Sequence, residues 1–380
     1  MKKKLIFLTE ALWVGGIETA LISLLRALDP EQYDVTLLTL REEADLAHRL
    51  PESVRFRQLT RQHPAYRHLR LYQLTEMPTR PSRRHRAVSW LMPGLRWLEL
   101  GLFAGFLRQQ LAGEQFDGAV IYSDGAAFAA SALQAKTHLL VYHHGSMRRT
   151  CRDGAAWRRC RHIVAVSCYQ AAALKTFRPR YAHKIAAIPN LLDGVWVQQA
   201  AGAFSPGFAP GKFHIVTCAR LHRDKGMDLA VDACARLGHL KDLHWWVLGG
   251  GPEEGTLRSR IRALGLEERM TLLGMQENPC PYLAACDLYV QPSRVEGCPM
   301  SIMEALALGK PVLSTDNPGA RERLGDGKYG LLCEGTPAGI ARGIDAFYRE
   351  RPGFPMWDWE NEGRAALAQL ESLLWKEGTP

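Results

Sequence analysis

Apolar residues in this chain form short runs that alternate with amphipathic stretches from the first residues onward. The run KKLIFLTEAL (3–12) leads to a Gly-Gly turn, residues 16–30 have apolar positions at helical spacing, and YDVTLLTL (33–40) is a second run. A strand, a helix and a strand in this order form a βαβ unit, which is typical of a parallel α/β sheet. We predict further strands of this sheet at 117–123, 138–144, 162–167 and 184–189.

A second series of the same kind follows a stretch rich in Gly, Ala and Pro at 198–212. We expect strands at 213–220, 243–250, 270–274, 287–293 and 311–315, and helices that begin near Met227, Pro252 and Pro299. The pattern predicts two doubly wound α/β domains, 1–197 and 213–354, with a linker at 198–212 and a ligand site in the cleft that the domains face. The tail from Ala338 to Leu374 has a helical pattern, and we expect 355–380 to pack back on the first domain.

Composition limits the class of protein. The 380 residues are 47% hydrophobic and 23% charged, as is ordinary for a folded chain of two domains. No apolar run reaches the roughly 18 residues that span a bilayer, and Glu10 interrupts the first run, so we expect a buried strand there and not a signal peptide. The nine cysteines form no C-x-x-C pair, so we expect no structural zinc, no disulfide framework and a reducing cytoplasm.

Two glutamates stand at either end of an apolar helical stretch in VEGCPMSIMEALALGKP (295–311). Pro299 suits the first turn of a helix, with Gly297 and Cys298 as its entry loop. The N–H groups of a buried helix start can hold an anion, and Glu296 and Glu304 would flank that anion. A phosphate between two sets of hydroxyls is the chemistry of a nucleotide sugar. The alternative is that Glu304 pairs with a buried arginine.

Three further segments carry polar groups at predicted strand ends. CARLHRDKG (218–226) offers Arg220 and Lys225, which could neutralise a diphosphate or lie in a solvated loop. VGGIE (14–18) lets backbone N–H groups approach a ligand, or is a simple tight turn. It is not G-x-G-x-x-G, so a nicotinamide cofactor is not indicated. VYHHGS (141–146) brings two histidines to a strand end, where either could bind a sugar hydroxyl or be a core residue.

Taken together and in this order, these segments resemble the retaining GT-B glycosyltransferases, most closely glycosyltransferase family 4 (the glycosyl transferases group 1 type). The E-x7-E motif (Glu296, Glu304) and the R-x4-K pair (Arg220, Lys225) carry the resemblance most specifically. It extends over nearly the whole chain, although it is weak between 40 and 113. Ala219 stands where the family has glycine, and the glycine usual after IPNLLD is missing.

The resemblance implies roles for individual residues. Glu304 would bind the ribose hydroxyls and Glu296 the donor sugar, while Arg220 and Lys225 would stabilise the leaving diphosphate. His144, in preference to His143, would lie near the transferred sugar. The implied donor-binding set is Gly15, Gly16, Arg220, Lys225, Glu296, Gly297, Cys298, Pro299, Met300, Ser301 and Glu304, and the implied catalytic set is Arg220, Lys225, His144 and Glu296.

The implied activity is transfer of a hexose, with retained configuration, from a nucleoside diphosphate sugar to a lipid-linked, lipopolysaccharide or surface polysaccharide acceptor. UDP is the favoured nucleotide, although the residues do not distinguish it from GDP. The resemblance implies no metal, no cofactor and no protein nucleophile. Another GT-B enzyme, a phosphorylase or a sugar-nucleotide epimerase, is the alternative within this fold.

Charge adds a second partner. The whole formal excess of +9 lies between Arg55 and Arg108, where eleven arginines face two glutamates. Trp90, Trp97, Phe103 and Phe106 accompany these arginines, as in elements that dock on a membrane surface. We therefore predict a cytoplasmic enzyme attached peripherally to the anionic inner face of the cell membrane; the alternative is a core of aromatics under solvated arginines. A nucleic-acid-binding protein is the other reading, but no zinc pattern, RNP motif or helix-turn-helix supports it.

Overall fold

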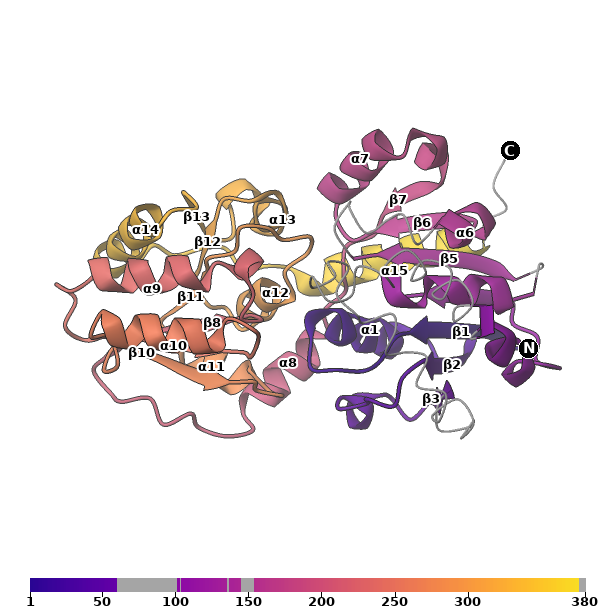
Figure 1. The fold of residues 1–380 in the computed structure, drawn as a ribbon, viewed down its shortest axis with the longest axis horizontal. Helices are drawn as coiled ribbons and strands as arrows, with labels where there is room; N and C mark the ends of the chain where they lie inside the picture. The colour runs from indigo at the N-terminus through magenta and orange to yellow at the C-terminus, as the bar shows by residue number, and fades with distance from the viewer. Residues whose placement is uncertain (60–100, 103, 135–136, 145–153, 376–380) are drawn as a thin grey trace, which may run out of the picture. The chain divides into compact units, whose positions relative to one another are not determined.

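The computed structural model describes residues 1–59, 101–102, 104–134, 137–144 and 154–375 (Figure 1). The chain forms two compact units by its internal contacts. Unit 1 comprises 1–165, 174–186 and 369–380, and unit 2 comprises 166–173 and 187–368. Most of the basic segment, including Trp90, Trp97 and Phe103, lies outside the described residues.

Unit 1 is built on a seven-stranded sheet in the order β3-β2-β1-β4-β5-β6-β7. The strands are β1 Lys3–Thr9, β2 Tyr33–Thr39, β3 Val54–Gln58, β4 Gly118–Ile121, β5 His138–His143, β6 His162–Ala165 and β7 Ile185–Ala187. Neighbouring strands from β3 to β6 pair in parallel, with Leu5 of β1 between Val35 and Gly118. Residues 5–8 are fully buried, because a central parallel strand is covered on both faces and is therefore apolar throughout.

The helical elements of unit 1 connect these strands. They include α1 Gly16–Ala27, η1 Ala47–Arg49, η3 Asp124–Ala132, α6 Gly154–Arg159, α7 Cys168–Phe177 and η5 Pro179–Lys184. The first six residues of α7 belong to unit 2 by their contacts. The expected strands and the first helix are confirmed, but the sequence pattern missed β3. Its residues VRFRQ alternate with arginine because β3 is an edge strand, and Arg55 is exposed there.

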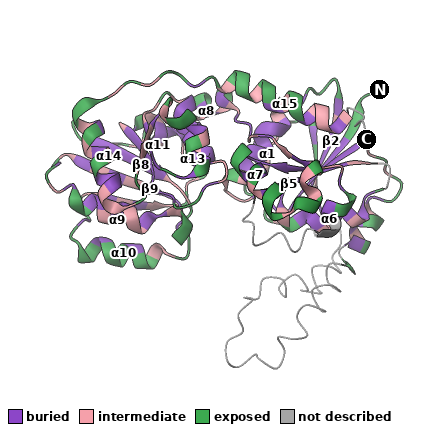
Figure 2. Cartoon of the chain, turned by 90° about the horizontal axis from the view of Figure 1, so that it is seen from above, coloured by how far each residue is buried: buried purple, intermediate pink, exposed green. Residues whose placement is uncertain are grey.

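Unit 2 has a six-stranded sheet in the order β10-β9-β8-β11-β12-β13, in which every two neighbouring strands pair in parallel. The strands are β8 Phe213–Cys218, β9 Leu243–Leu248, β10 Met270–Gly274, β11 Leu288–Gln291, β12 Val312–Thr315 and β13 Leu331–Cys333. Its core includes Trp245, whose indole Nε1 donates to the Thr217 hydroxyl at 3.0 Å. In both units the central strands are largely buried, while most exposed residues lie on helices and loops (Figure 2).

Two groups of helices cover this second sheet. One group is α9 Met227–Arg236, α10 Glu254–Ala263 and α14 Pro337–Glu350, and the other is α8 Gly194–Ala201, α11 Cys280–Ala285 and α12 Met300–Ala307. The short elements η6 Arg223–Lys225, α13 Pro318–Arg323 and η7 Gly325–Gly327 complete the unit. The helices expected at Pro252 and Pro299 therefore begin at Glu254 and Met300, and Pro299 is the N-cap of α12 instead of a first-turn residue.

The C-terminal part contains two helices where the pattern suggested one. Helix α14 ends at Glu350, Arg351 has φ 46°, and α15 Trp359–Trp375 follows after a segment that contains Pro352. Proline cannot continue a helix, so the chain must leave α14 here. The last turns of α15 pack on unit 1, whereas the part of the expected segment before Gln369 belongs to unit 2. The Tyr33 hydroxyl donates to Glu371 at 2.9 Å, and Leu370 and Leu374 are fully buried.

Residues 198–212, which we expected as a linker, lie within unit 2, since that unit begins again at Ala187. Helix α8 packs on α11, where Asn278 donates to the Ala200 carbonyl oxygen at 2.9 Å. The Phe208 ring stacks on Trp246 at 4.9 Å. These contacts connect the segment to the second sheet.

Candidate functional site

Lys225 and Glu296 form an ion pair at the carboxyl edge of the second sheet. The Lys225 Nζ lies 2.8 Å from Oε1 and 2.7 Å from Oε2 of Glu296. Only 5% of the Glu296 side chain and 22% of the Lys225 side chain are exposed. Lys225 follows β8 and Glu296 follows β11, and these two strands are parallel neighbours, so their following loops start side by side. We expected separate roles for these two residues, and the structure joins them in one ion pair.

The turn that carries Lys225 is held against the Glu296 loop at three points. Gly226 has φ 66°, and a Cβ there would lie 2.0 Å from the Pro292 carbonyl oxygen. Arg294 donates to both carboxylate oxygens of Asp228 at 2.7 Å and to the Arg223 carbonyl oxygen at 2.8 Å. The backbone therefore determines where the Lys225 amine lies. Sequence reasoning missed the pair of Arg294 and Asp228.

Arg220 lies at the start of the same loop and is exposed. Its carbonyl oxygen accepts from the His222 N–H at 2.8 Å, which shapes the turn. An exposed guanidinium on the loop that also carries Lys225 can reach an anionic ligand. The structure thus places both members of the R-x4-K pair at one sheet edge.

The start of α12 forms the other side of this edge. Gly297 and Cys298 are half-buried in the entry loop, Pro299 and Met300 are buried, and Glu304 is 6% exposed one turn into the helix. Burial raises the pKa of the Cys218 thiol to about 12, and the nearby charge of Glu304 adds to the shift. The two glutamates of the E-x7-E motif are therefore both buried at this edge.

The loop after β12 also confines Glu296. A Cβ at Gly319, near the start of α13, would lie 2.5 Å from the Glu296 carbonyl oxygen. Asn317, the N-cap of α13, donates to the Ser293 carbonyl oxygen at 3.2 Å. Only glycine permits this approach, so the backbone around Glu296 is enclosed from two directions.

Unit 1 holds the remaining predicted residues. Gly15 is the N-cap of α1 and Gly16 its first residue, so their N–H groups lie at a helix start. A Cβ at Gly15 would lie 2.6 Å from the Oε2 atom of Glu18, which is buried in the first turn. That atom is the end of a flexible side chain, so this contact alone does not require glycine at this position.

The two histidines differ in their surroundings. His143 is fully buried, its Nδ1 lies 3.1 Å from Asp124 Oδ1, and its ring meets Trp157 edge-on. His144 is half-buried and packs on Tyr122 and Tyr142, with ring centroids 4.9 and 5.8 Å away. Among the described residues, Nε2 of both rings has no hydrogen-bond partner, so the two histidines differ in exposure and in the Asp124 contact of His143. The environment of His144 therefore suits ligand contact better than that of His143, and the role itself stays a prediction.

Burial lowers the pKa of His144 to about 4. The unfolded chain therefore binds more protons than the native one between about pH 4 and 6.5, and stability rises with pH across this window by up to about 3 kcal/mol. We expect the His144→Asn variant to lose this rise in urea unfolding measured from pH 4.5 to 7. The exposed His183 supplies the control: His183→Asn should keep the wild-type pH dependence. Identical curves for wild type and His144→Asn would contradict the assignment of burial as the cause.

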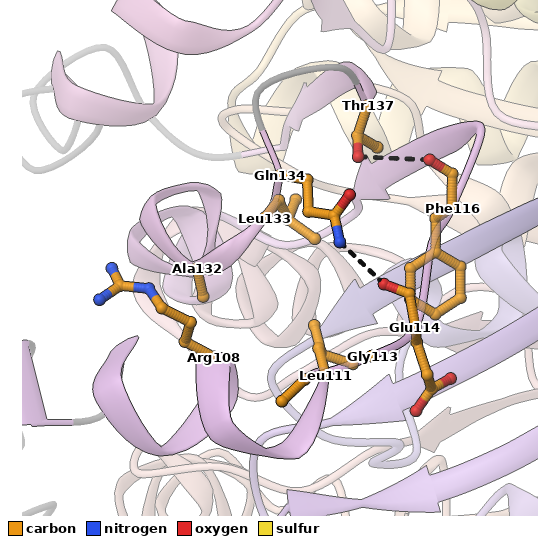
Figure 3. A pocket seen from close by; sticks show the side chains of 10 residues that line it. Arg108, Leu111, Gly113, Glu114, Phe116, Ala132, Leu133, Gln134 and Thr137 are labelled. Carbon is orange, nitrogen blue, oxygen red and sulfur yellow. Dashed lines mark hydrogen bonds between the residues drawn. The ribbon is translucent and has the colours of Figure 1, made fainter.

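A hollow of about 170 Å³ lies elsewhere in unit 1, lined in part by Arg108, Leu111 and Leu133. The Gln134 amide donates to the Glu114 carbonyl oxygen at 3.1 Å, and the Thr137 hydroxyl donates to the Phe116 carbonyl oxygen at 3.3 Å (Figure 3). These segments precede β4 and β5, so the hollow lies at the amino edge of the sheet. None of the predicted site residues lines it.

The described residues show neither a metal site nor a membrane-spanning helix. They contain no group of three or more His, Cys, Asp or Glu side chains that could hold a metal ion. Within the same residues, no helix combines the length and apolar character needed to cross a bilayer.

Two protein-family models match the chain. The model for glycosyltransferase family 4 matches residues 14–193, and the model for glycosyl transferases group 1 matches 200–362. The chain belongs to the family 4 (group 1 type) glycosyltransferases that these two models describe. The second match contains Arg220, Lys225, Glu296 and Glu304 together.

Curated relatives match over shorter segments. The N-acetylgalactosamine-N,N'-diacetylbacillosaminyl-diphospho-undecaprenol 4-alpha-N-acetylgalactosaminyltransferase of Campylobacter jejuni is 39% identical over 121 residues, 32% of this chain and 33% of the relative. The lipopolysaccharide core biosynthesis glycosyltransferase LpsE of Rhizobium meliloti is 33% identical over 132 residues, 34% of this chain and 38% of the relative. The matched segments thus span only about a third of these relatives' length.

A solved structure matches over the whole fold. Anabaena Alr3699/HepE in complex with UDP and glucose has a TM-score of 0.72 and 19% sequence identity, covering 97% of this chain and 100% of that one. The predicted fold class, two doubly wound α/β domains of the GT-B type, is confirmed by this likeness and by the two parallel sheets.

Proposed function

We propose that this family member is a retaining, metal-independent glycosyltransferase that moves a hexose from a UDP-sugar to a lipid-linked or lipopolysaccharide acceptor. The observation that carries the proposal is the Lys225–Glu296 pair beside the buried start of α12, with Glu304 one turn further. A cation, helix N–H groups and two carboxylates suit a ligand with a diphosphate between two sets of hydroxyls. The UDP and glucose held by the Anabaena protein, and the two relatives' names, support the choice of donor and acceptor.

The reaction follows from where charge develops. The bond between the sugar C1 and the diphosphate oxygen breaks while the acceptor oxygen bonds to C1 on the same face, and the acceptor proton passes to the leaving phosphate. Negative charge grows on the diphosphate, so Lys225 and Arg220 stabilise the transition state more than the ground state. Glu304 holds the ribose hydroxyls, Glu296 and His144 hold the sugar, and Gly15 and Gly16 offer N–H groups to the diphosphate.

A donor panel of UDP- and GDP-sugars tests this proposal, with nucleotide release as the readout. We expect release from at least one UDP-sugar, and UDP binding that weakens roughly 10- to 100-fold in Glu304→Ala, because a hydrogen-bonded carboxylate is lost. Glu267→Ala, an exposed carboxylate in the same unit, is the matched control and should bind UDP as the wild type does. Absence of release from every donor, together with unchanged thermal stability in UDP and GDP, would refute the transferase function.

We also propose that the region from Arg55 to Arg108 attaches the enzyme to an anionic membrane surface on the cytoplasmic side. Of its described arginines, Arg55 pairs with Asp34, Arg57 pairs with Glu114, and Arg108 donates to the Ser131 carbonyl oxygen. The attraction must therefore come mainly from the arginines between 60 and 100, which lie outside the described residues.

Co-sedimentation with vesicles measures this attraction. We expect binding to phosphatidylglycerol vesicles at low salt, no binding to phosphatidylcholine vesicles, and binding at least tenfold weaker when Arg83, Arg84 and Arg86 become glutamine. Arg55→Gln, which removes an ion-paired arginine, should change binding little. Equal binding to both lipids, or to neither, would count against attachment to an anionic membrane surface.

A further inference from the structure

Two buried polar side chains, Gln291 at the end of β11 and Ser293 two residues later, hold the Glu296 carboxylate. The Gln291 amide Nε2 donates to Glu296 Oε1 at 2.9 Å, and the Ser293 hydroxyl donates to the same oxygen at 2.6 Å. Gln291 Nε2 also donates to Ser293 Oγ at 2.7 Å. Gln291 and Ser293 are at most 1% exposed, and a polar side chain so deeply buried is costly unless its hydrogen bonds are made.

The carboxylate determines the direction of every hydrogen bond in this group of side chains. An ionised carboxylate only accepts, so Gln291 must turn its NH₂ group toward Glu296. Its carbonyl oxygen then accepts from the Tyr289 hydroxyl and from Ser301 Oγ, the latter at 3.3 Å. Burial raises the pKa of Tyr289 well above its usual value, so the phenol keeps the proton that it donates. Both donors and both acceptor positions of Gln291 are thus used.

The two oxygens of Glu296 differ as a result. Oε1 accepts from Gln291, Ser293 and Lys225, while Oε2 accepts only from Lys225 among the described residues. Three donors fill the acceptor capacity of Oε1, and Oε2 keeps a lone pair for a ligand hydroxyl.

We propose that Gln291 and Ser293 are positioning residues, which hold Glu296 by Oε1 so that Oε2 faces a hydroxyl of the donor sugar. This inference rests on the proposed function and adds which oxygen binds the sugar and which residues aim it. Neither residue needs to touch the ligand. Because Glu296 binds the sugar and not the nucleotide, substitution of either residue is expected to weaken binding of the sugar half of the donor only.

The test compares UDP with a complete donor. Calorimetry gives the affinity for UDP and for one UDP-sugar. The UDP-sugar is UDP-glucose, UDP-N-acetylglucosamine or UDP-N-acetylgalactosamine, whichever the enzyme turns over in the donor panel. The kcat and KM for the same donor are measured alongside. Gln291→Met keeps the volume and removes the polar contacts, and we expect at least tenfold weaker binding of the UDP-sugar with UDP affinity within twofold of wild type. Ser293→Ala should weaken UDP-sugar binding three- to tenfold, and Ser293→Thr, which keeps the hydroxyl, should restore it.

Thr217→Val is the matched control, because Thr217 is a fully buried polar residue of the adjacent strand β8. Its hydroxyl donates to the Val290 carbonyl oxygen and accepts from the Trp245 indole, but it does not contact Glu296. The substitution should lower thermal stability without changing the ratio of UDP-sugar to UDP affinity. If Gln291→Met does not fold, the two Ser293 variants decide the question alone. An unchanged ratio in Gln291→Met and Ser293→Ala, in an active wild-type enzyme, overturns this inference only. A wild type that binds no UDP-sugar overturns the proposed function and this inference with it.

Discussion

Lys225→Ala is expected to reduce sugar transfer by at least about 100-fold, since loss of one preorganised electrostatic contact to a developing charge costs roughly 10²- to 10³-fold in kcat. Lys225 is 22% exposed on its side chain and contacts both oxygens of Glu296. Its removal takes a cation from the diphosphate and also leaves a buried carboxylate without its ion-pair partner, which is a large penalty. Initial rates at saturating and at limiting UDP-sugar measure the resulting losses in kcat and in kcat/KM.

A double-mutant cycle shows whether Lys225 and Glu296 act as one unit. We expect Lys225→Ala, Glu296→Gln and the double variant to have similar kcat/KM values, because residues that act together are strongly non-additive. Lys241→Ala, an exposed lysine before β9, is the matched control and should transfer sugar at the wild-type rate. Additive losses in the double variant would mean that the two side chains contribute independently, against the shared role inferred from their contact.

Much of this site could be predicted from the sequence, because its motifs stand directly after the apolar runs that predict strands. The R-x4-K and E-x7-E segments follow apolar runs, and the carboxyl ends of parallel strands meet at one edge. The direct contact between Lys225 and Glu296 could not be predicted, because it depends on which strands are neighbours and on the turn at Gly226. Both features are set by tertiary packing and leave no local pattern.

Gln291, which was not predicted as a site residue, did leave a signal in the sequence. Strand β11 (Leu288–Gln291), within the segment DLYVQPS (287–293), is buried on both faces, so apolar side chains are expected at nearly every position. Gln291 departs from this expectation, and a buried polar residue is a more informative observation than an exposed apolar one. Pro352 likewise indicated the end of α14. The edge strand β3 had no such marker, since the arginines of VRFRQ are typical of a solvated loop.

Gly226→Ala is expected to destabilise unit 2 by roughly 2 to 4 kcal/mol in its free energy of unfolding and to abolish transfer. Gly226 has φ 66°, which costs a residue with a Cβ about 1 to 2 kcal/mol, and the new Cβ would lie 2.0 Å from the Pro292 carbonyl oxygen. The backbone must shift to relieve this clash. Lys225 is the preceding residue, so the same shift moves its amine away from Glu296.

Urea unfolding followed by tryptophan fluorescence measures the loss, with Gly255→Ala as the matched control. Gly255 lies in α10, and a Cβ there would meet no atom within 4 Å. Alanine in place of glycine in a helix should stabilise the protein by about 0.5 to 1 kcal/mol. The two substitutions are chemically identical, so opposite signs isolate the effect of the Gly226 backbone. If both variants unfolded at the wild-type urea concentration, the turn would not be the element that places Lys225, and the ion pair would have to be explained by the Glu296 loop alone.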